Sequence, residues 1–418
     1  MHEFQYKNGQ LHAEGVSLKS IAAKVGTPFY CYSATTLTRH FDAFDHPLSP
    51  LLHLICFSMK ANSNVAVLNL MVKKGAGVDI VSGGELYRAL IAGASPAKIV
   101  FSGVGKTDEE IGYALRQKIL MFNVESEEEL RRISSIAKKM KAAAPIAIRV
   151  NPNIDAKTHP YISTGLKKSK FGIQTDASLK LYHEAKRLPG IKIVGIDCHI
   201  GSQLTTLAPM IEALSRVKIL YRKLAEMGIP IRLIDLGGGL GITYKDEVPP
   251  HPTEYARAII DAAAGLPATF IFEPGRVIVG NAGILVTKVL YRKRQGKRRF
   301  LIVDAAMNDL IRPALYDSYQ ELLPVTQKNG RRETLDVVGP ICESGDFFAK
   351  GRRFPWLKAG SLVSIMSAGA YGFTMASNYN SRPRIPEVMV RGDRFMVVRE
   401  RENYRDLLRG EKIPKFLN

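Results

Sequence analysis

The chain has 418 residues, and its 59 Lys and Arg against 39 Asp and Glu give a formal net charge of +20 at pH 7 with His neutral. Hydrophobic residues at 46% and charged residues at 23% are ordinary for a globular protein and exclude a disordered chain. No apolar run approaches the roughly 18 residues that a membrane helix needs, and the opening residues lack the pattern of a signal peptide. We therefore expect a cytoplasmic protein that does not contact the membrane.

The cysteines and the basic residues argue against three further classes of protein. Cys31, Cys56, Cys198 and Cys342 are scattered without metal-ligand spacing, which disfavours a disulfide scaffold, a zinc domain or any bound metal. The densest basic run, Arg292–Arg299, brackets a turn-forming Gln-Gly between two apolar segments and contains no aromatic residue for base stacking. This run is typical of a solvated hairpin tip, so we do not expect nucleic acid as a partner.

Between about residue 50 and residue 276, short apolar runs alternate with amphipathic helical stretches, one of which opens with a capping box at Ser126 and Glu129. Such alternation indicates parallel strands, and eight of them predict an α/β protein built on a (β/α)8 TIM barrel. A doubly wound sheet is the alternative, although the first strand leads into Met59–Asn62 and not into a glycine-rich turn. The predicted strands are Leu52–Ser58, Gly77–Ser82, Lys98–Ser102, Leu120–Val124, Ile146–Asn151, Ile193–His199, Arg232–Leu236 and Thr269–Glu273.

After Arg276 the pattern changes to short strand-like runs separated by Gly, Pro and charged turns, which predicts a mainly antiparallel β domain. Two early runs, Phe4–Tyr6 and Pro28–Tyr32, precede the barrel and could join that domain. We therefore expect three segments: N-terminal strands in 1–32 that join the C-terminal β domain, the barrel in 33–278, and the C-terminal β domain in 279–418. The later runs are Ile284–Tyr291, Phe300–Val303, Leu335–Val338, Leu362–Ser364, Glu387–Arg391 and Phe395–Arg399.

Polar side chains or glycines lie at or just beyond the carboxyl ends of the predicted barrel strands. Barrels carry their active sites at these carboxyl ends. A lone Lys after a strand is usually a solvated surface residue, and a lone His is usually structural, but here each polar group falls where the fold places function. In chain order these residues are Lys60, Asp79, Ser102, Asn123, Asn151, His199, the run Gly237–Gly239, and Glu273 with Arg276.

The loops after the seventh and eighth predicted strands form a candidate phosphate site. Four glycines in five positions, Gly237–Gly241, are more than a simple turn requires, and barrels bind phosphate with the backbone N–H groups of these loops. A phosphate here, with Lys60 after the first strand and Glu273 after the eighth, suggests pyridoxal phosphate. Lys60 would form the Schiff base, Glu273 would keep the pyridine nitrogen protonated, and His199 would lie against the ring.

The motifs, taken together and in this order, resemble the diaminopimelate decarboxylases, a family of the alanine-racemase-like group (fold-type III) of pyridoxal-phosphate enzymes. The resemblance covers nearly the whole chain, and six motifs in the right order are very specific. They are Phe57–Ser63, His199–Gln203, Gly237–Gly241, Glu273–Arg276, Cys342–Asp346 and Gly369–Gly372, supported by Thr158–Gly165 and Arg312–Tyr316.

The resemblance implies a homodimer with shared active sites that decarboxylates meso-2,6-diaminopimelate to L-lysine and CO2, the last step of lysine biosynthesis. It implies that Lys60 and Cys342 are catalytic, with Cys342 acting as the acid in the pocket of the other subunit. The implied cofactor-binding residues are Lys60, His199, Ser202, Gly239, Glu273, Pro274, Gly275, Arg276 and Tyr371. The implied substrate-binding residues are Arg276, Arg312, Tyr316, Glu343 and Tyr371.

Three alternatives share this fold. An amino-acid racemase of this group usually places Arg, not an acid such as Glu273, at the pyridine nitrogen. An ornithine or arginine decarboxylase would bind a purely cationic tail, against which Arg276 and Arg312 would be badly placed. A non-catalytic regulator would be expected to lose Lys60 or Cys342, and both are present. The pattern therefore favours the diaminopimelate reaction.

Overall fold

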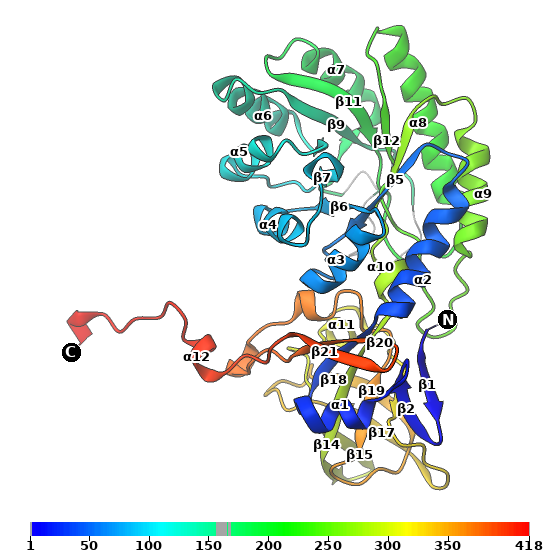
Figure 1. Ribbon diagram of the computed structural model, residues 1–418, viewed down its shortest axis with the longest axis vertical. Helices are drawn as coiled ribbons and strands as arrows, with labels where there is room; N and C mark the ends of the chain where they lie inside the picture. Colours follow the sequence, from blue (N-terminus) through cyan, green and yellow to red (C-terminus); the bar gives the residue numbers. More distant parts are fainter. Residues whose placement is uncertain (1, 156–164, 166–168, 418) are drawn as a thin grey trace. The chain divides into compact units, whose positions relative to one another are not determined.

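The computed structural model describes residues 2–155, 165 and 169–417, and it divides into two compact units, Thr38–Val279 and Met1–Leu37 with Gly280–Asn418 (Figure 1). Residues 158–164 of the predicted Thr158–Gly165 motif lie outside the described residues.

The first unit is a closed barrel of parallel strands. Each strand pairs in parallel with the next, and the last of the eight, β13, pairs with the first, β5, through Phe270 beside His53. This closure confirms the predicted (β/α)8 barrel and excludes a doubly wound sheet, which would have two open edges. The strands are β5 (His53–Ser58), β6 (Gly77–Ile80), β7 (Ile99–Phe101), β8 (Met121–Val124), β9 (Ala144–Asn151), β11 (Ile191–Asp197), β12 (Leu233–Asp235) and β13 (Thr269–Phe272), with the two-residue β10 (Ile173–Gln174) beside β9.

The helices of this unit lie around the outside of the strands (Figure 1). They are α2 (Ala34–Asp45), which begins in the other unit, then α3 (Val65–Lys73), α4 (Gly83–Ile91), α5 (Asp108–Gln117), α6 (Glu127–Lys139), α7 (Thr175–Ala185), α8 (Ala208–Glu226), α9 (Pro252–Ala263) and the short α10 (Arg276–Val279). The capping box predicted for α6 is only half formed: Ser126 accepts a hydrogen bond from the Glu129 backbone, but the Glu129 carboxylate binds Lys106 Nζ (2.7 Å) and the Glu125 N–H (2.8 Å).

Side chains inside the barrel change from apolar to polar along the strands. One buried apolar cluster contains Cys56, Val100, Met121, Ala147, Val194 and Ile271. Because side chains alternate along a strand, the residue two positions later again points inward. The positions two residues after five of these are Ser58, Ser102, Asn123, Arg149 and Glu273. An apolar layer therefore lies directly beneath a polar layer at the carboxyl ends of the strands.

The second unit contains two β-sheets. The small sheet joins β1 (Phe4–Lys7), β2 (Gln10–Ala13) and β3 (Val16–Ser17), which lead into α1 (Leu18–Val25), while β4 (Phe29–Ser33) lies in the larger sheet between β14 and β20. The larger sheet is mainly antiparallel, as predicted, although β15–β17 and β4–β20 pair in parallel. Its other strands are β14 (Gly283–Gln295), β15 (Arg298–Val303), β16 (Leu322–Pro324), β17 (Arg332–Val338), β18 (Phe347–Pro355), β19 (Leu362–Ile365), β20 (Glu387–Arg391) and β21 (Arg394–Arg399).

The basic run forms the predicted hairpin, since β14 and β15 pair antiparallel up to Gln295 and Arg298. The turn itself is Gly296-Lys297, one residue later than the Gln-Gly of the prediction. None of the helices in the described part of the chain is long and apolar enough to cross a membrane.

Candidate active site

Lys60, just after β5, rests against a buried carboxylate. Its Nζ lies 2.8 Å from Oδ2 of Asp79 on β6, and Ser58 Oγ donates to the same oxygen at 2.7 Å. The Asp79 side chain is completely buried, whereas the Lys60 side chain keeps 38% of its surface exposed. The buried carboxylate thus fixes the amine while leaving it reachable.

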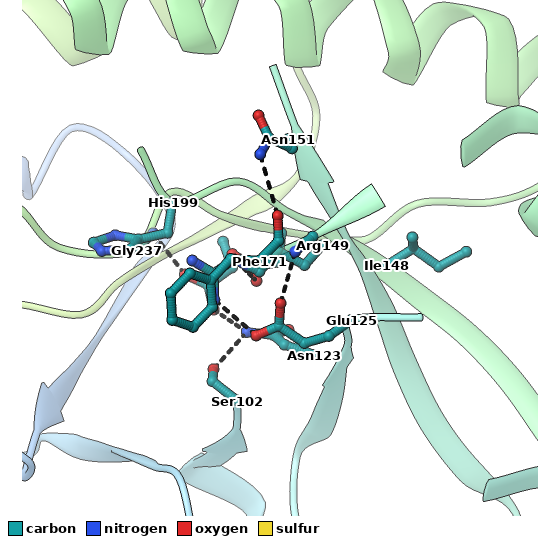
Figure 2. Close-up of polar contacts among 12 residues, drawn as sticks. Ser102, Asn123, Glu125, Ile148, Arg149, Asn151, Phe171, His199 and Gly237 are labelled. Carbon is teal, nitrogen blue, oxygen red and sulfur yellow. Dashed lines mark hydrogen bonds and ion pairs between the residues drawn. The ribbon is translucent and has the colours of Figure 1, made fainter. Parts of the chain in front are cut away.

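Glu273 and Asp235 are buried in one polar layer with Asn123 and Ser102, and Figure 2 shows Asn123 beside Ser102. The Asn123 amide donates to Ser102 Oγ and to Asp235 Oδ2, both at 3.1 Å, and Ser102 Oγ lies 3.5 Å from Glu273 Oε1. Burial raises the pKa of Glu273 well above its usual value, and the nearby carboxylate of Asp235 adds to the shift. Burial also raises the pKa of Asp235 to about 6. This pair therefore tends to retain a proton.

His199 lies against the glycine-rich loop that follows β12. The backbone N–H of Gly238 donates to His199 Nδ1 at 3.2 Å, so the ring carries its own proton on Nε2. Gly237 has φ +63°, and a Cβ there would lie 2.4 Å from His199 Nδ1, so only glycine fits beside the ring. Desolvation, followed by the nearby cation of Arg149, lowers the pKa of His199 well below its usual value. The imidazole is therefore neutral.

The glycine-rich loop after β12 is also joined to the loop after β11. Gln203 donates to the Ile242 carbonyl at 2.6 Å and accepts from its N–H at 3.2 Å. Gly239 has φ +125°, and a Cβ there would lie 2.6 Å from the Gly201 oxygen. The backbones of the loops after β11 and β12 thus approach closely enough that a side chain at Gly239 would clash.

Arg276 points its guanidinium to the same loops. It donates to Ser202 Oγ at 3.1 Å and to the hydroxyl of Tyr244 at 2.7 Å. The structure therefore brings together Ser202 and Arg276, as the sequence predicted, and adds Tyr244. Tyr244 lies in a loop without any periodic pattern, so nothing in the sequence marked it.

The loop after β13 is held to its neighbours on both sides. Glu273 N–H donates to the Gly237 carbonyl at 2.8 Å, and the Pro274 carbonyl accepts from Ser58 N–H at 3.1 Å. A Cβ on Gly275 would lie 2.9 Å from Ala61 Cβ, so this loop packs directly on the residue after Lys60. The loops after strands β5, β12 and β13 form one continuous rim.

Arg149 is a buried cation that sequence reasoning missed (Figure 2). It donates to Glu125 Oε1 at 2.7 Å, and its guanidinium lies 4.8 Å from the centre of the Phe171 ring. The Asn151 amide donates to the Phe171 carbonyl at 3.1 Å, and Glu125 Oε2 accepts from Gly172 N–H at 2.8 Å. The sequence signal that could have revealed Arg149 is a charged residue at an inward-facing position of an otherwise apolar strand.

The remaining predicted residues lie in the β unit. Arg312 is buried at the start of α11 (Arg312–Tyr316), and its guanidinium lies 5.7 Å from the centre of the Tyr316 ring. Tyr371 adopts a left-handed backbone conformation with φ +55°.

Cys342 and Glu343 lie on an exposed loop that Asp346 organises. The buried Asp346 carboxylate accepts from Ile341 N–H (2.7 Å) and Met307 N–H (2.8 Å). The other three cysteines are buried, and burial raises the pKa of each thiol, whereas Cys342 is exposed. Cys342 is thus the accessible thiol of the four.

The polarity of the barrel site fits pyridoxal phosphate. At one side, the described residues place four buried acids, Asp79, Asp197, Asp235 and Glu273, beside two cations, Lys60 and Arg149. Among these residues, Asp79 Oδ1 and Asp197 Oδ1 have no hydrogen-bond partner. This excess of carboxylates suits a pyridinium. At the other side, Arg276, Ser202 and the glycine loops offer donors, which suit a phosphate.

Comparison with known proteins agrees with this geometry. The family model for the pyridoxal-binding domain of pyridoxal-dependent decarboxylases matches residues 34–280. The chain is 52% identical to the diaminopimelate decarboxylase of Vibrio cholerae, over 97% of this chain and 98% of the relative, and 50% identical to that of Pseudomonas aeruginosa, over 99% of each.

Two solved structures extend the similarity to the whole fold. The Helicobacter pylori diaminopimelate decarboxylase complexed with L-lysine aligns with a TM-score of 0.91 at 44% identity, covering 94% of this chain and 98% of that one. The M. jannaschii enzyme in co-complex with L-lysine aligns at 0.94 and 37% identity, covering all of both chains. The chain therefore belongs to the diaminopimelate decarboxylase family of pyridoxal-phosphate-dependent decarboxylases.

Proposed function

We propose that this protein decarboxylates meso-2,6-diaminopimelate to L-lysine and CO2, the last step of lysine biosynthesis, in the cytoplasm. The observation that carries the proposal is the strand-end arrangement of Lys60 on buried Asp79 with the carboxylate pair of Glu273 and Asp235 alongside. The high identity to diaminopimelate decarboxylases and the L-lysine bound in two related structures support the choice of substrate.

The barrel, residues 33–278, would hold the cofactor. Pyridoxal phosphate, when bound, supplies an electron sink for the electron pair that remains when CO2 leaves. Lys60 would hold it covalently, Glu273 would face its ring nitrogen, and neutral His199 would cover its ring. Ser202, Gly239, Pro274, Gly275 and Arg276 would surround its phosphate, and Tyr371 would complete the set.

The chain's own groups would control the proton that the reaction needs. The raised pKa of Glu273 keeps a proton available at the base of the site. Cys342 would donate the proton that replaces CO2 on the reacting carbon, and its exposure on the protein surface supports a role in the pocket of a second subunit. We therefore propose a homodimer with shared sites, in which residues 279–418, joined by 1–32, face the partner's barrel.

Charged side chains would recognise the distal end of the substrate. Diaminopimelate carries a carboxylate and an ammonium there, and Arg312 with Tyr316 would bind the first while Glu343 binds the second. Arg276 and Tyr371 would complete the grip. An ornithine- or arginine-type tail is a cation alone and would leave the buried Arg312 facing like charge. A racemase is disfavoured because carboxylic Glu273 strengthens the electron sink.

The direct test measures CO2 release by the purified holoenzyme. We expect release from meso-diaminopimelate and none from ornithine, arginine or lysine. In Arg312→Leu the KM for diaminopimelate should rise roughly ten- to a hundredfold, because a charge-assisted hydrogen bond of about 1.5–3 kcal/mol is lost. Glu343→Gln should also raise the KM for diaminopimelate, because the variant loses the carboxylate that would bind the distal ammonium of the substrate. An Arg312→Leu enzyme with wild-type KM would refute the substrate assignment.

Glu273→Gln should have two separate effects, a lower kcat and a weaker dependence of Tm on pH. A neutral amide cannot stabilise a pyridinium, so kcat should fall on the order of 10²–10³-fold while cofactor stays bound. The folded-state pKa of Glu273 is raised, so its contribution to stability is complete below the unfolded pKa of about 4.3 and is lost as pH rises through the folded value. Both proteins are compared without cofactor. As the pH rises above 5, the Tm of wild type should therefore fall more steeply than the Tm of Glu273→Gln.

Calorimetry between pH 5 and pH 9 gives the comparison, and Glu128→Gln on the exposed face of α6 controls for the loss of one charge. Parallel Tm curves for wild type and Glu273→Gln, or an unchanged kcat, would contradict the role of Glu273.

A further inference from the structure

The segment after Glu402 carries large apolar side chains that nothing in the described part of the chain covers. We call Asn403–Leu417 the arm. It follows β21 and runs away from the sheet of its own unit, drawn in red in Figure 1. Its exposed apolar residues are Tyr404 (78% exposed), Leu408 (63%), Ile413 (79%), Phe416 (85%) and Leu417 (69%).

The arm has defined local structure. Asn403 caps the one-turn helix α12 (Tyr404–Leu407) by accepting from Arg405 N–H at 2.8 Å, and the Asp406 carboxylate accepts from Asn403 N–H at 2.8 Å. A second turn, Lys415–Leu417, follows Pro414. Disordered segments are poor in such apolar residues, and one-turn helices do not persist alone in water. The arm's sequence is that of a segment that packs on a surface.

The base of the arm is tied to the Cys342 loop. Glu402 Oε2 accepts from the Asn378 amide at 2.7 Å and from Arg384 N–H at 2.8 Å. Two residues after Asn378, the Asn380 side chain accepts from Cys342 N–H at 2.8 Å. Tyr379, between them, is 44% exposed, and its hydrogen bond to Glu343 raises the pKa of the phenol. One short segment therefore anchors both the arm and the exposed thiol loop.

We propose that the arm packs on a second copy of this chain, the same copy whose pocket receives the Cys342 loop. This inference rests on the shared-site dimer of the proposed function. The common anchor at Asn378–Arg384 makes the arm continuous with the surface that faces the partner. In a two-fold contact each subunit gives one arm and receives one, so the dimer buries two copies of every apolar residue of the arm.

The first test removes the arm from the holoenzyme. A chain that stops after Glu402 and the full-length double variant Ile413→Asp/Phe416→Asp should both raise the dimer Kd at least roughly a hundredfold in analytical ultracentrifugation, the size expected when central apolar anchors are lost. The control is Leu52→Asp/Ile219→Asp, which places the same charges at exposed apolar positions (77% and 54%) of the barrel unit, just before β5 and on α8. An unchanged Kd in both arm variants would overturn the proposal.

The second test identifies the surface that the arm touches. A photoreactive residue at Phe416 is introduced into isotopically light protein, which is then exchanged with heavy wild-type protein until mixed dimers form. Cross-links from light arms to heavy chains are expected. If the light arms in mixed dimers cross-link only to their own light chain, the inference is wrong. It is also wrong if the arm binds anionic lipid vesicles while its removal leaves the dimer unchanged.

Failure of this inference and failure of the proposed function are distinguishable. A wild-type protein that is monomeric and still releases CO2 from diaminopimelate refutes the arm's role and leaves the reaction intact. If loss of the arm weakens the dimer but the wild-type protein does not act on diaminopimelate, the proposed reaction is refuted and the arm's role is left intact.

Discussion

Replacing Lys60 by alanine should lower decarboxylation by on the order of 10⁴-fold or more and abolish the visible absorbance of protein-bound cofactor. Lys60 is the amine that approaches within 2.8 Å of a fully buried carboxylate at the carboxyl end of the barrel. By the proposal it bonds the cofactor covalently, which alanine cannot do. Because alanine also leaves Asp79 buried without its cation, Lys60→Arg should be measured beside it. Arginine keeps the ion pair and the fold but cannot bond the cofactor.

Lys74→Ala is the matched control. Lys74 Nζ lies 2.7 Å from Asp42 Oδ1, and its side chain is 32% exposed, much like Lys60, but it lies on the outside of the barrel after α3. Its loss should leave absorbance and turnover unchanged. Borohydride reduction followed by peptide mapping should label Lys60, and a label on any other lysine would refute the assignment.

Mixing two inactive variants should restore about a quarter of wild-type activity. Lys60→Ala and Cys342→Ala homodimers should each be nearly inactive. Unfolded together and reassociated at random, equal amounts give about half heterodimers, each with one pocket that has both residues and one that has neither. Half of the pockets in half of the dimers are then intact, which gives the expected quarter.

The control for this experiment mixes Lys60→Ala with Glu273→Gln. Both residues belong to the barrel unit, so every pocket in their heterodimer lacks one of the two and no activity should return. If the first mixture stays inactive after reassociation to dimers, Cys342 serves its own subunit and the shared site is wrong. Recovery in the control mixture would equally contradict the assignment of Glu273.

The fold and the polar layer at the carboxyl ends of its strands could be predicted because their signals are local. Alternating apolar and amphipathic runs determine a (β/α)8 barrel, and the period of two along each strand places Ser102, Asn123 and Glu273 in one layer. The resemblance to diaminopimelate decarboxylases was confirmed by the comparisons. The catalytic and binding roles of the individual residues stay predictions, which the variants above test.

What the sequence did not reveal depends on contacts between distant segments. Glu129 had the spacing of a capping box, but Lys106 competes for its carboxylate from another loop. Arg149 is a charge in a strand that was expected to be apolar, and its pairing with the buried carboxylates of Glu125 and Asp197 explains its burial. Strand β18 was not predicted because Gly351 and several charges interrupt its apolar pattern.

The seam between β13 and β5 has a consequence for how the protein acquires its cofactor during synthesis. Phe270 and His53 pair from opposite ends of the barrel sequence, and Glu273 and Lys60 lie just beyond them on the two sides of the seam. Contacts of such high sequence separation form late, after the loop-closure entropy of the whole barrel has been overcome. If the cofactor binds as proposed, a nascent chain that still lacks β13 has no complete cofactor site, and pyridoxal phosphate should stabilise by mass action only the chains whose barrels have already closed.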